Sequence, residues 1–195
     1  MSQPKGLNDI YRIRARFGRS VNITADFAAG ESLKDYIITP LTREVLRRVI
    51  TGLRPESYQR AWSIIGPYGV GKSACALFLA RLLGRPKDTY ARELLRVADG
   101  RLYDDICTSI PRFENSGFLI TLVVGNRAPL GTTILRSLAN ALASAEWRGK
   151  RAELVRDRVK QLCLRSQQGE NISNDEISDC FDNVAHMARD KNGVG

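Results

Sequence analysis

Apolar residues recur at helical spacing along most of the chain. Between Pro40 and Gly52 they fall on one face of the segment, with proline in the first turn and glycine as a natural terminator. Because apolar positions three and four apart share one side of a helix, this pattern predicts an amphipathic α-helix. The same spacing predicts further helices over 72–83, from Asp88 to about Ala98, from Pro129 to Ala145, around Val155, Val159 and Leu162, and from Ser173 to Gly193.

Two apolar runs lack helical spacing. Residues 61–66 read AWSIIG, and residues 118–125 read FLITLVVG, in which Thr121 is the one polar residue. Runs of this kind are typical of parallel strands that are covered on both faces. Residues 11–23 instead alternate apolar and basic side chains, which suits an exposed strand or an extended arm. The sequence therefore predicts an α/β fold with parallel strands and several amphipathic helices.

The composition is that of one folded domain. With 43% hydrophobic and 26% charged residues among 195, the chain is neither disordered nor of low complexity. No apolar run approaches the roughly 20 residues that span a bilayer, and residues 1–18 lack the apolar core of a signal peptide, so we expect a cytoplasmic protein with no membrane partner. Four cysteines without a CxxC pair, and one histidine, argue against a zinc site and favour cysteines that serve as small buried hydrophobes.

One motif carries chemistry. Residues 66–73 read GPYGVGKS and match the phosphate-loop pattern G-x-x-x-x-G-K-[ST] at every fixed position. The motif lies between a predicted strand and a predicted buried helix, which is the context that the pattern requires. The predicted nucleotide-binding residues are Gly66, Pro67, Tyr68, Gly69, Val70, Gly71, Lys72, Ser73 and Ala74.

The fixed residues of the motif have physical reasons. A nucleoside triphosphate carries its charge on phosphate oxygens, which backbone N–H groups at a helix N-terminus bind well. Gly69 and Gly71 can adopt positive φ angles, so that the backbone wraps closely around the phosphates. We expect the Lys72 ammonium to reach the β- and γ-phosphates and the Ser73 hydroxyl to ligate Mg²⁺. ATP and Mg²⁺ are therefore the predicted ligands.

Hydrolysis of ATP needs a catalytic acid that binding of ATP does not need. In phosphate-loop ATPases a second buried strand ends in an acid that holds the metal ion and polarises the attacking water. Residues 118–125 are followed by Asn126 and Arg127 instead. The acidic pair Asp104 and Asp105 follows no buried apolar run, and we interpret it as part of a solvated helix turn. We therefore do not expect this chain alone to hydrolyse ATP.

Three longer segments carry a family resemblance. The segments DFAAGESLKDYIITPLTREVLRRVITGL, RAWSIIGPYGVGKSACALFLARLLG and FLITLVVGNRAPLGTTILRSLANAL cover most of residues 20–147. Together they resemble the N-terminal part of large bacterial AAA-like P-loop ATPases of antiphage-defence and DNA-processing loci. The resemblance implies a partial three-layer P-loop fold, with an arm and helix over 1–58 and an incomplete core over 59–195. It also implies other protein subunits as partners, and a sequence that stops just before the strand bearing the catalytic acid.

The resemblance also has a consequence for solubility. In the resembled fold the strands at 61–66 and 118–125 are not neighbours, and further strands lie between them. Strand edges without a partner and with apolar faces promote aggregation or pairing with another chain. We therefore expect the 195-residue chain to be poorly soluble alone, as measured by light scattering after size-exclusion chromatography. A monodisperse monomer with a sharp thermal transition would contradict this expectation.

Two alternative functions stay open. A small-molecule or nucleotide kinase has similar length, and Arg127 would then contact the transferred phosphoryl group while Arg148, Lys150 and Arg151 form a lid. The net charge of +9 also allows contact with DNA or RNA, since residues 127–168 hold nine basic and three acidic side chains. The basic residues of this second alternative are Arg148, Lys150, Arg151, Arg156, Arg158, Lys160 and Arg165, although a solvated helix face is the favoured explanation of them. We assign the lone His186 to the surface or core edge of a helix.

Overall fold

The structure is a computed structural model that describes residues 21–29, 33–84, 87–115, 117–125, 127–144 and 150–190, with side chains up to 187 in the last range. The predicted arm up to residue 20, Arg148 and the Gly193 terminator lie outside these ranges. Nine helices occupy 67% of the described residues. They are α2 (Ile23–Ala28), α3 (Pro40–Leu53), α4 (Lys72–Leu83), α5 (Thr89–Ala98), α6 (Gly100–Ser109), α7 (Pro111–Asn115), α8 (Leu130–Ser144), α9 (Lys150–Gln167) and α10 (Asn174–Asp190).

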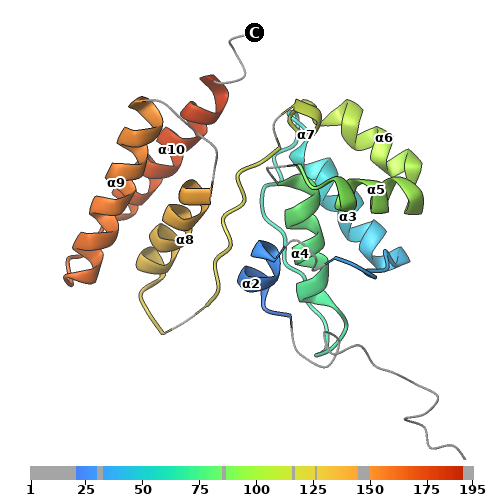
Figure 1. Cartoon of the computed structure of the whole chain (residues 1–195), viewed down its shortest axis with the longest axis horizontal. Helices are drawn as coiled ribbons and strands as arrows, with labels where there is room; N and C mark the ends of the chain where they lie inside the picture. The colour runs from blue at the N-terminus through green and yellow to red at the C-terminus, as the bar shows by residue number, and fades with distance from the viewer. Residues whose placement is uncertain are drawn as a thin grey trace, which may run out of the picture.

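The predicted α/β fold is wrong, because the described residues contain no β-strand and no sheet. Residues 61–66 and 118–125 run as extended chain but do not pair with each other, and a sheet exists only where neighbouring strands exchange hydrogen bonds (Figure 1). Within the described ranges, the one ladder contact is an isolated parallel bridge between Gly84 and Phe118. The protein is therefore all-α over its described residues.

The helices α2 to α7 surround one hydrophobic core, and α4 lies at its centre (Figure 1). Leu77, Phe78 and Leu82 of α4 are fully buried among apolar side chains of α3, α5, α6 and α7. The α4 sequence is apolar on nearly every side, so it needs neighbours all round. The prediction of a buried helix over 72–83 is confirmed.

Side-chain caps set where the surrounding helices begin. The hydroxyl oxygen of Thr39 accepts from the backbone N–H of Thr42 at 3.2 Å, and Pro40 occupies the first turn of α3. Asp88 caps α5 as predicted. Asp99 caps α6 by accepting from Leu102 N at 3.1 Å, so the chain re-enters a helix that the apolar pattern did not predict.

Arg81 joins three helices of this group. Its guanidinium donates to the Asp88 carboxylate at 3.0 Å and to the backbone carbonyl of Phe27, and it lies 5.3 Å from the centre of the Phe27 ring. Both Arg81 and Asp88 are largely shielded from water, which strengthens their ion pair. The contact holds α2 and the start of α5 against α4.

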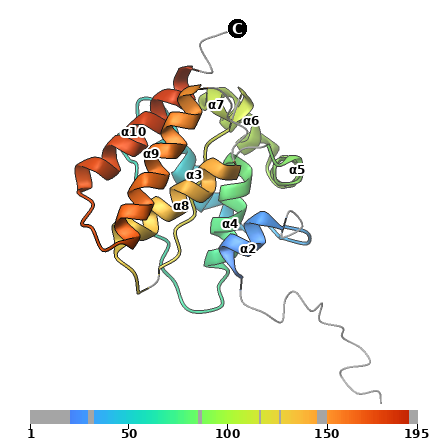
Figure 2. The ribbon, with the colours of Figure 1, turned by 60° about the vertical axis from the view of Figure 1, so that its left-hand side comes forward.

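The helices α8, α9 and α10 form a second core beside the first (Figures 1 and 2). The predicted apolar positions Val155, Val159 and Leu162 of α9 are buried in it. The predicted capping box is also confirmed, because Ser173 N donates to Glu176 Oε2 at 3.1 Å and Glu176 N donates to Ser173 Oγ at 3.2 Å. The Arg165 guanidinium, with the Ser173 amide, lowers the pKa of the Glu176 carboxyl.

The extended segment 118–125 passes between the two helical groups (Figure 1). Phe118 packs against the first core and Leu119 against the second, which is the two-sided alternation of a strand. None of the described helices has the length and apolar character needed to cross a membrane.

Gly52 and Gly100 form a matched pair of helical glycines that test the packing. A Cβ atom on Gly52 would lie 2.1 Å from the Trp62 ring and 2.9 Å from Gln59 O, whereas one on Gly100 would meet nothing within 4 Å. We expect Gly52→Ala to lower the free energy of unfolding by about 1–3 kcal/mol through overpacking. Gly100→Ala should leave it unchanged or raise it by up to about 1 kcal/mol. Urea denaturation measures both, and equal stability of the two variants would contradict the packing.

Candidate nucleotide site

The segment that leads into the phosphate loop is anchored on α3. The Trp62 ring lies against Gly52, and the Arg60 guanidinium donates to the backbone carbonyl of Gly52. Trp62 therefore packs against α3, although its segment is not a strand. The apolar pattern from Pro40 predicted Gly52 only as the end of the helix. In the structure, the missing side chain of Gly52 also makes room for the Trp62 indole. An anchored segment fixes where the loop begins.

Two glycines shape the loop. Gly69 has φ +84° and Gly71 has φ +85°, the left-handed region in which other residues are strained. A Cβ atom on either glycine would meet no heavy atom within 4 Å, so the space beside both is open. Gly71 is the N-cap of α4 and provides no capping side chain. The predicted positive φ angles are therefore present.

Lys72 closes the loop on itself. Its ammonium donates to the backbone carbonyls of Gly66 at 2.8 Å and Pro67 at 2.6 Å, across five to six residues of chain. Residues 66–72 consequently form a curled loop rather than an extended run. The two carbonyls hold the ammonium against the first residues of the loop, beside the first turn of α4.

The backbone N–H groups from Gly69 to Ala74 have no acceptor among the described residues. The first helical bond of α4 runs from Cys75 N to Gly71 O at 2.9 Å. The positive end of the α4 dipole adds to these free donors. The free N–H donors and the helix dipole together favour an anion with several oxygen atoms at this loop.

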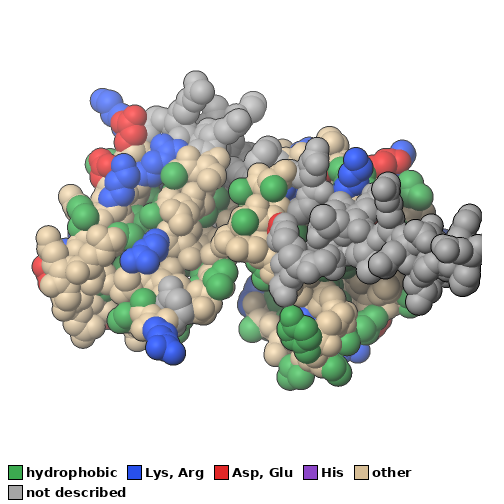
Figure 3. Space-filling model, turned by 60° about the horizontal axis from the view of Figure 1, so that its bottom comes forward, with side chains coloured by type: hydrophobic (Ala, Val, Ile, Leu, Met, Phe, Trp, Pro, Cys, Tyr) green, Lys and Arg blue, Asp and Glu red, His purple; other side chains and the backbone are tan. Residues whose placement is uncertain are grey.

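The loop is open to water at one end of the molecule. Tyr68 is 92% exposed and Ile65 is 90% exposed, and Figure 3 views this end, where hydrophobic side chains reach the surface. Ser73 is exposed and Ala74 half-buried. Ser73 is therefore open to a ligand that approaches from solvent.

Other predicted residues lie elsewhere. Asp104 and Asp105 belong to α6, which confirms a helical position, and Asp105 accepts two hydrogen bonds from Arg54 at 2.8 and 2.9 Å. The described residues contain no group of three or more potential metal-ligating side chains. Asp105 thus links α6 to the end of α3, whereas Asp104 is exposed on α6.

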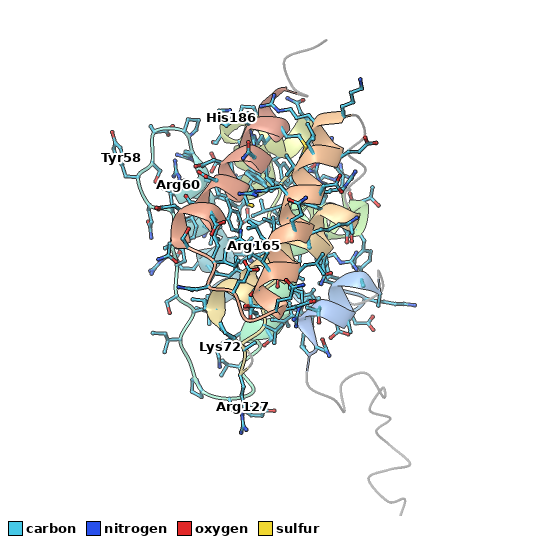
Figure 4. The ribbon with its side chains drawn as sticks, turned by 90° about the vertical axis from the view of Figure 1, so that its left-hand side faces the viewer. Tyr58, Arg60, Lys72, Arg127, Arg165 and His186 are labelled. Atoms are coloured by element: carbon cyan, nitrogen blue, oxygen red, sulfur yellow. The ribbon has the colours of Figure 1, made fainter. Side chains whose placement is uncertain are left out.

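The arginines proposed for a kinase or a nucleic-acid surface are dispersed. Figure 4 shows Arg127 at the same end of the molecule as Lys72, with Arg165 and His186 toward other parts. Arg165 donates to Glu170 at 2.6 Å and to Glu176 at 2.7 Å, and Arg156 donates to Leu142 O at 3.2 Å. The exposed remainder of the basic set on α9 is Lys150, Arg151, Arg158 and Lys160. His186 is exposed on α10, as predicted for a helix surface.

Two of the four cysteines are buried like small hydrophobic side chains, and the other two are half-buried. Cys75 on α4 and Cys180 on α10 are buried, whereas Cys107 and Cys163 are half-buried. Burial raises the pKa of the Cys75 thiol, which keeps it protonated one turn behind the loop. Burial and the neighbouring Glu114 carboxylate raise the pKa of Cys107 to about 11. Neither shift favours the thiolate that a nucleophilic cysteine needs.

No protein-family model, curated protein or solved structure matches this chain. The candidate site consequently rests on the motif and on the geometry of its loop.

Gly71→Ala tests the backbone requirement of the loop. An L-residue in the left-handed region costs about 1–2 kcal/mol, so we expect a loss of stability of that order and weaker binding of a polyanion. Gly125→Ala is the control, because a Cβ atom there meets nothing within 4 Å and φ is not positive. Thermal unfolding with and without Mg-ATP measures both effects. A Gly71→Ala protein that matches the control in both would refute the strained loop.

Proposed function

We propose that the protein binds a nucleoside triphosphate with Mg²⁺ through residues 66–74. The observation that carries this proposal is the closed loop, in which Lys72 bonds to the carbonyls of Gly66 and Pro67 ahead of unpaired amides at the start of α4. The loop reads phosphate groups, so it selects for a triphosphate chain and not for a base. The resemblance stated above favours ATP as the nucleotide, serving an ATPase of DNA processing or phage defence.

Lys72 acts as an exchangeable ligand in this proposal. In the free loop its ammonium donates to the two backbone carbonyls, and on binding it turns to the β- and γ-phosphate oxygens. Charge-assisted hydrogen bonds to phosphate are stronger than bonds to neutral carbonyls, so the exchange is favourable. The free amides from Gly69 to Ala74 then receive phosphate oxygens in place of water.

Ser73 fits Mg²⁺ through its hydroxyl. Mg²⁺ keeps several water molecules and takes few protein ligands when phosphate oxygens are present, so a single exposed hydroxyl is sufficient. When bound, the ion neutralises charge on the β- and γ-phosphates. The side chain lies in the first turn of α4, next to the residue that contacts the same phosphates.

Lys72→Ala tests the proposal. Loss of a charged hydrogen-bond donor costs about 1.5–3 kcal/mol, which corresponds to roughly 10- to 150-fold weaker Mg-ATP binding. Lys150→Ala is the matched control, because it removes the same charge from an exposed position on α9. Isothermal titration calorimetry with Mg-ATP, and with AMP as the weak ligand, provides the measurement. Equal affinity of the two variants would end the proposal.

A further inference from the structure

Past Phe118, the backbone of the extended segment 118–125 has no partner among the described residues. Phe118 N donates to Leu83 O at 2.8 Å, and among the described residues the amides from Leu119 to Gly125 donate to no other protein group. The segment is neutral and rich in β-branched and aliphatic side chains. Val123 is 45% exposed and Val124 is 51% exposed. Such an edge pairs readily with another extended chain.

The Phe118 bond identifies which edge of the segment is free. The N–H and C=O groups of one residue in an extended chain point to one side, and those of the next residue point to the other. Because Phe118 bonds toward the end of α4, the amides of Leu119, Thr121 and Val123 face the opposite edge. Three alternate residues therefore present unpaired donors and acceptors in one row.

A cavity lies beside this segment. It has a volume of about 270 Å³ and is bordered by α2, by α8 and by Leu119, Ile120 and Leu122. Its walls mix apolar side chains with hydroxyl and amide groups, as in Phe27, Ser137 and Asn140. The cavity leaves open space between the segment and these two helices.

We propose that a second copy of this chain covers this edge, with the two 118–125 segments paired antiparallel about Thr121. In this register Thr121 faces Thr121 of the other copy, and Leu119 faces Val123. Apolar side chains then oppose apolar side chains on both faces, and no charge opposes a like charge. A twofold axis closes the assembly at two chains, since the same edge is used by both. The proposal does not depend on nucleotide binding.

The oligomeric state provides the first test. We expect size-exclusion chromatography with light scattering to find a dimer that dissociates on dilution. Thr121→Lys places two like charges opposite each other and should give a monomer. Val97→Lys is the control, because Val97 is 77% exposed on α5, away from the edge, and this variant should remain dimeric. A wild-type monomer at all concentrations, or a dimer that Thr121→Lys leaves intact, would overturn the proposal.

Disulfide crosslinking tests the register without relying on a disruptive variant. In a background with Cys107→Ser and Cys163→Ser, Thr121→Cys should form a crosslinked dimer under mild oxidation, because directly paired Cα atoms lie about 5.5 Å apart. Val123→Cys should not crosslink, since the two copies of residue 123 would be roughly 14 Å apart along the strands. Crosslinking of both variants to the same extent, or aggregates without preference for position 121, would refute the antiparallel pairing.

Discussion

The burial of α4 is the constraint on which the rest of the structure depends. Its side chains are apolar on almost every side, and they share one core with side chains of α3, α5, α6 and α7. Arg81 holds α2 to the same helix through Phe27 and Asp88. Because the body of α4 is fixed, its first turn and the free amides there are held in one place. The phosphate loop thus takes its geometry from a hydrophobic core that touches no ligand.

The extended segments are the second feature that governs the molecule. Residues 61–66 carry the chain from α3 to the loop, and residues 118–125 carry it from the first core to the second. Both present apolar side chains, and among the described residues neither pairs with a neighbouring strand over most of its length. Packing of side chains from two helical groups supports residues 118–122, but it leaves backbone groups unpaired. An unpaired backbone edge of this kind favours pairing with another extended chain.

Local patterns and long-range contacts differed in how far they could be predicted. Helix α3 and the capping box of α10 depend on residues three or four apart, and both were predicted. Helix α6 was missed because its start depends on the Asp99 cap directly after α5. The contact between Gly52 and Trp62 was missed because it joins positions ten residues apart that no period connects. The error in fold class arose because an apolar run indicates an extended, covered segment but cannot show whether a neighbouring strand exists.

The sequence by itself determined the helices with strong apolar periodicity, the phosphate-loop motif, and the positive φ angles that its glycines adopt. Each of these is a local property, set by hydrogen bonds and steric limits within a few residues. Only the tertiary structure decided that the Lys72 ammonium bonds to the Gly66 and Pro67 carbonyls. It also decided that Asp105 pairs with Arg54, and that residues 61–66 and 118–125 do not pair with each other. Those outcomes depend on which surfaces meet, and that is fixed by the packing of two separate cores.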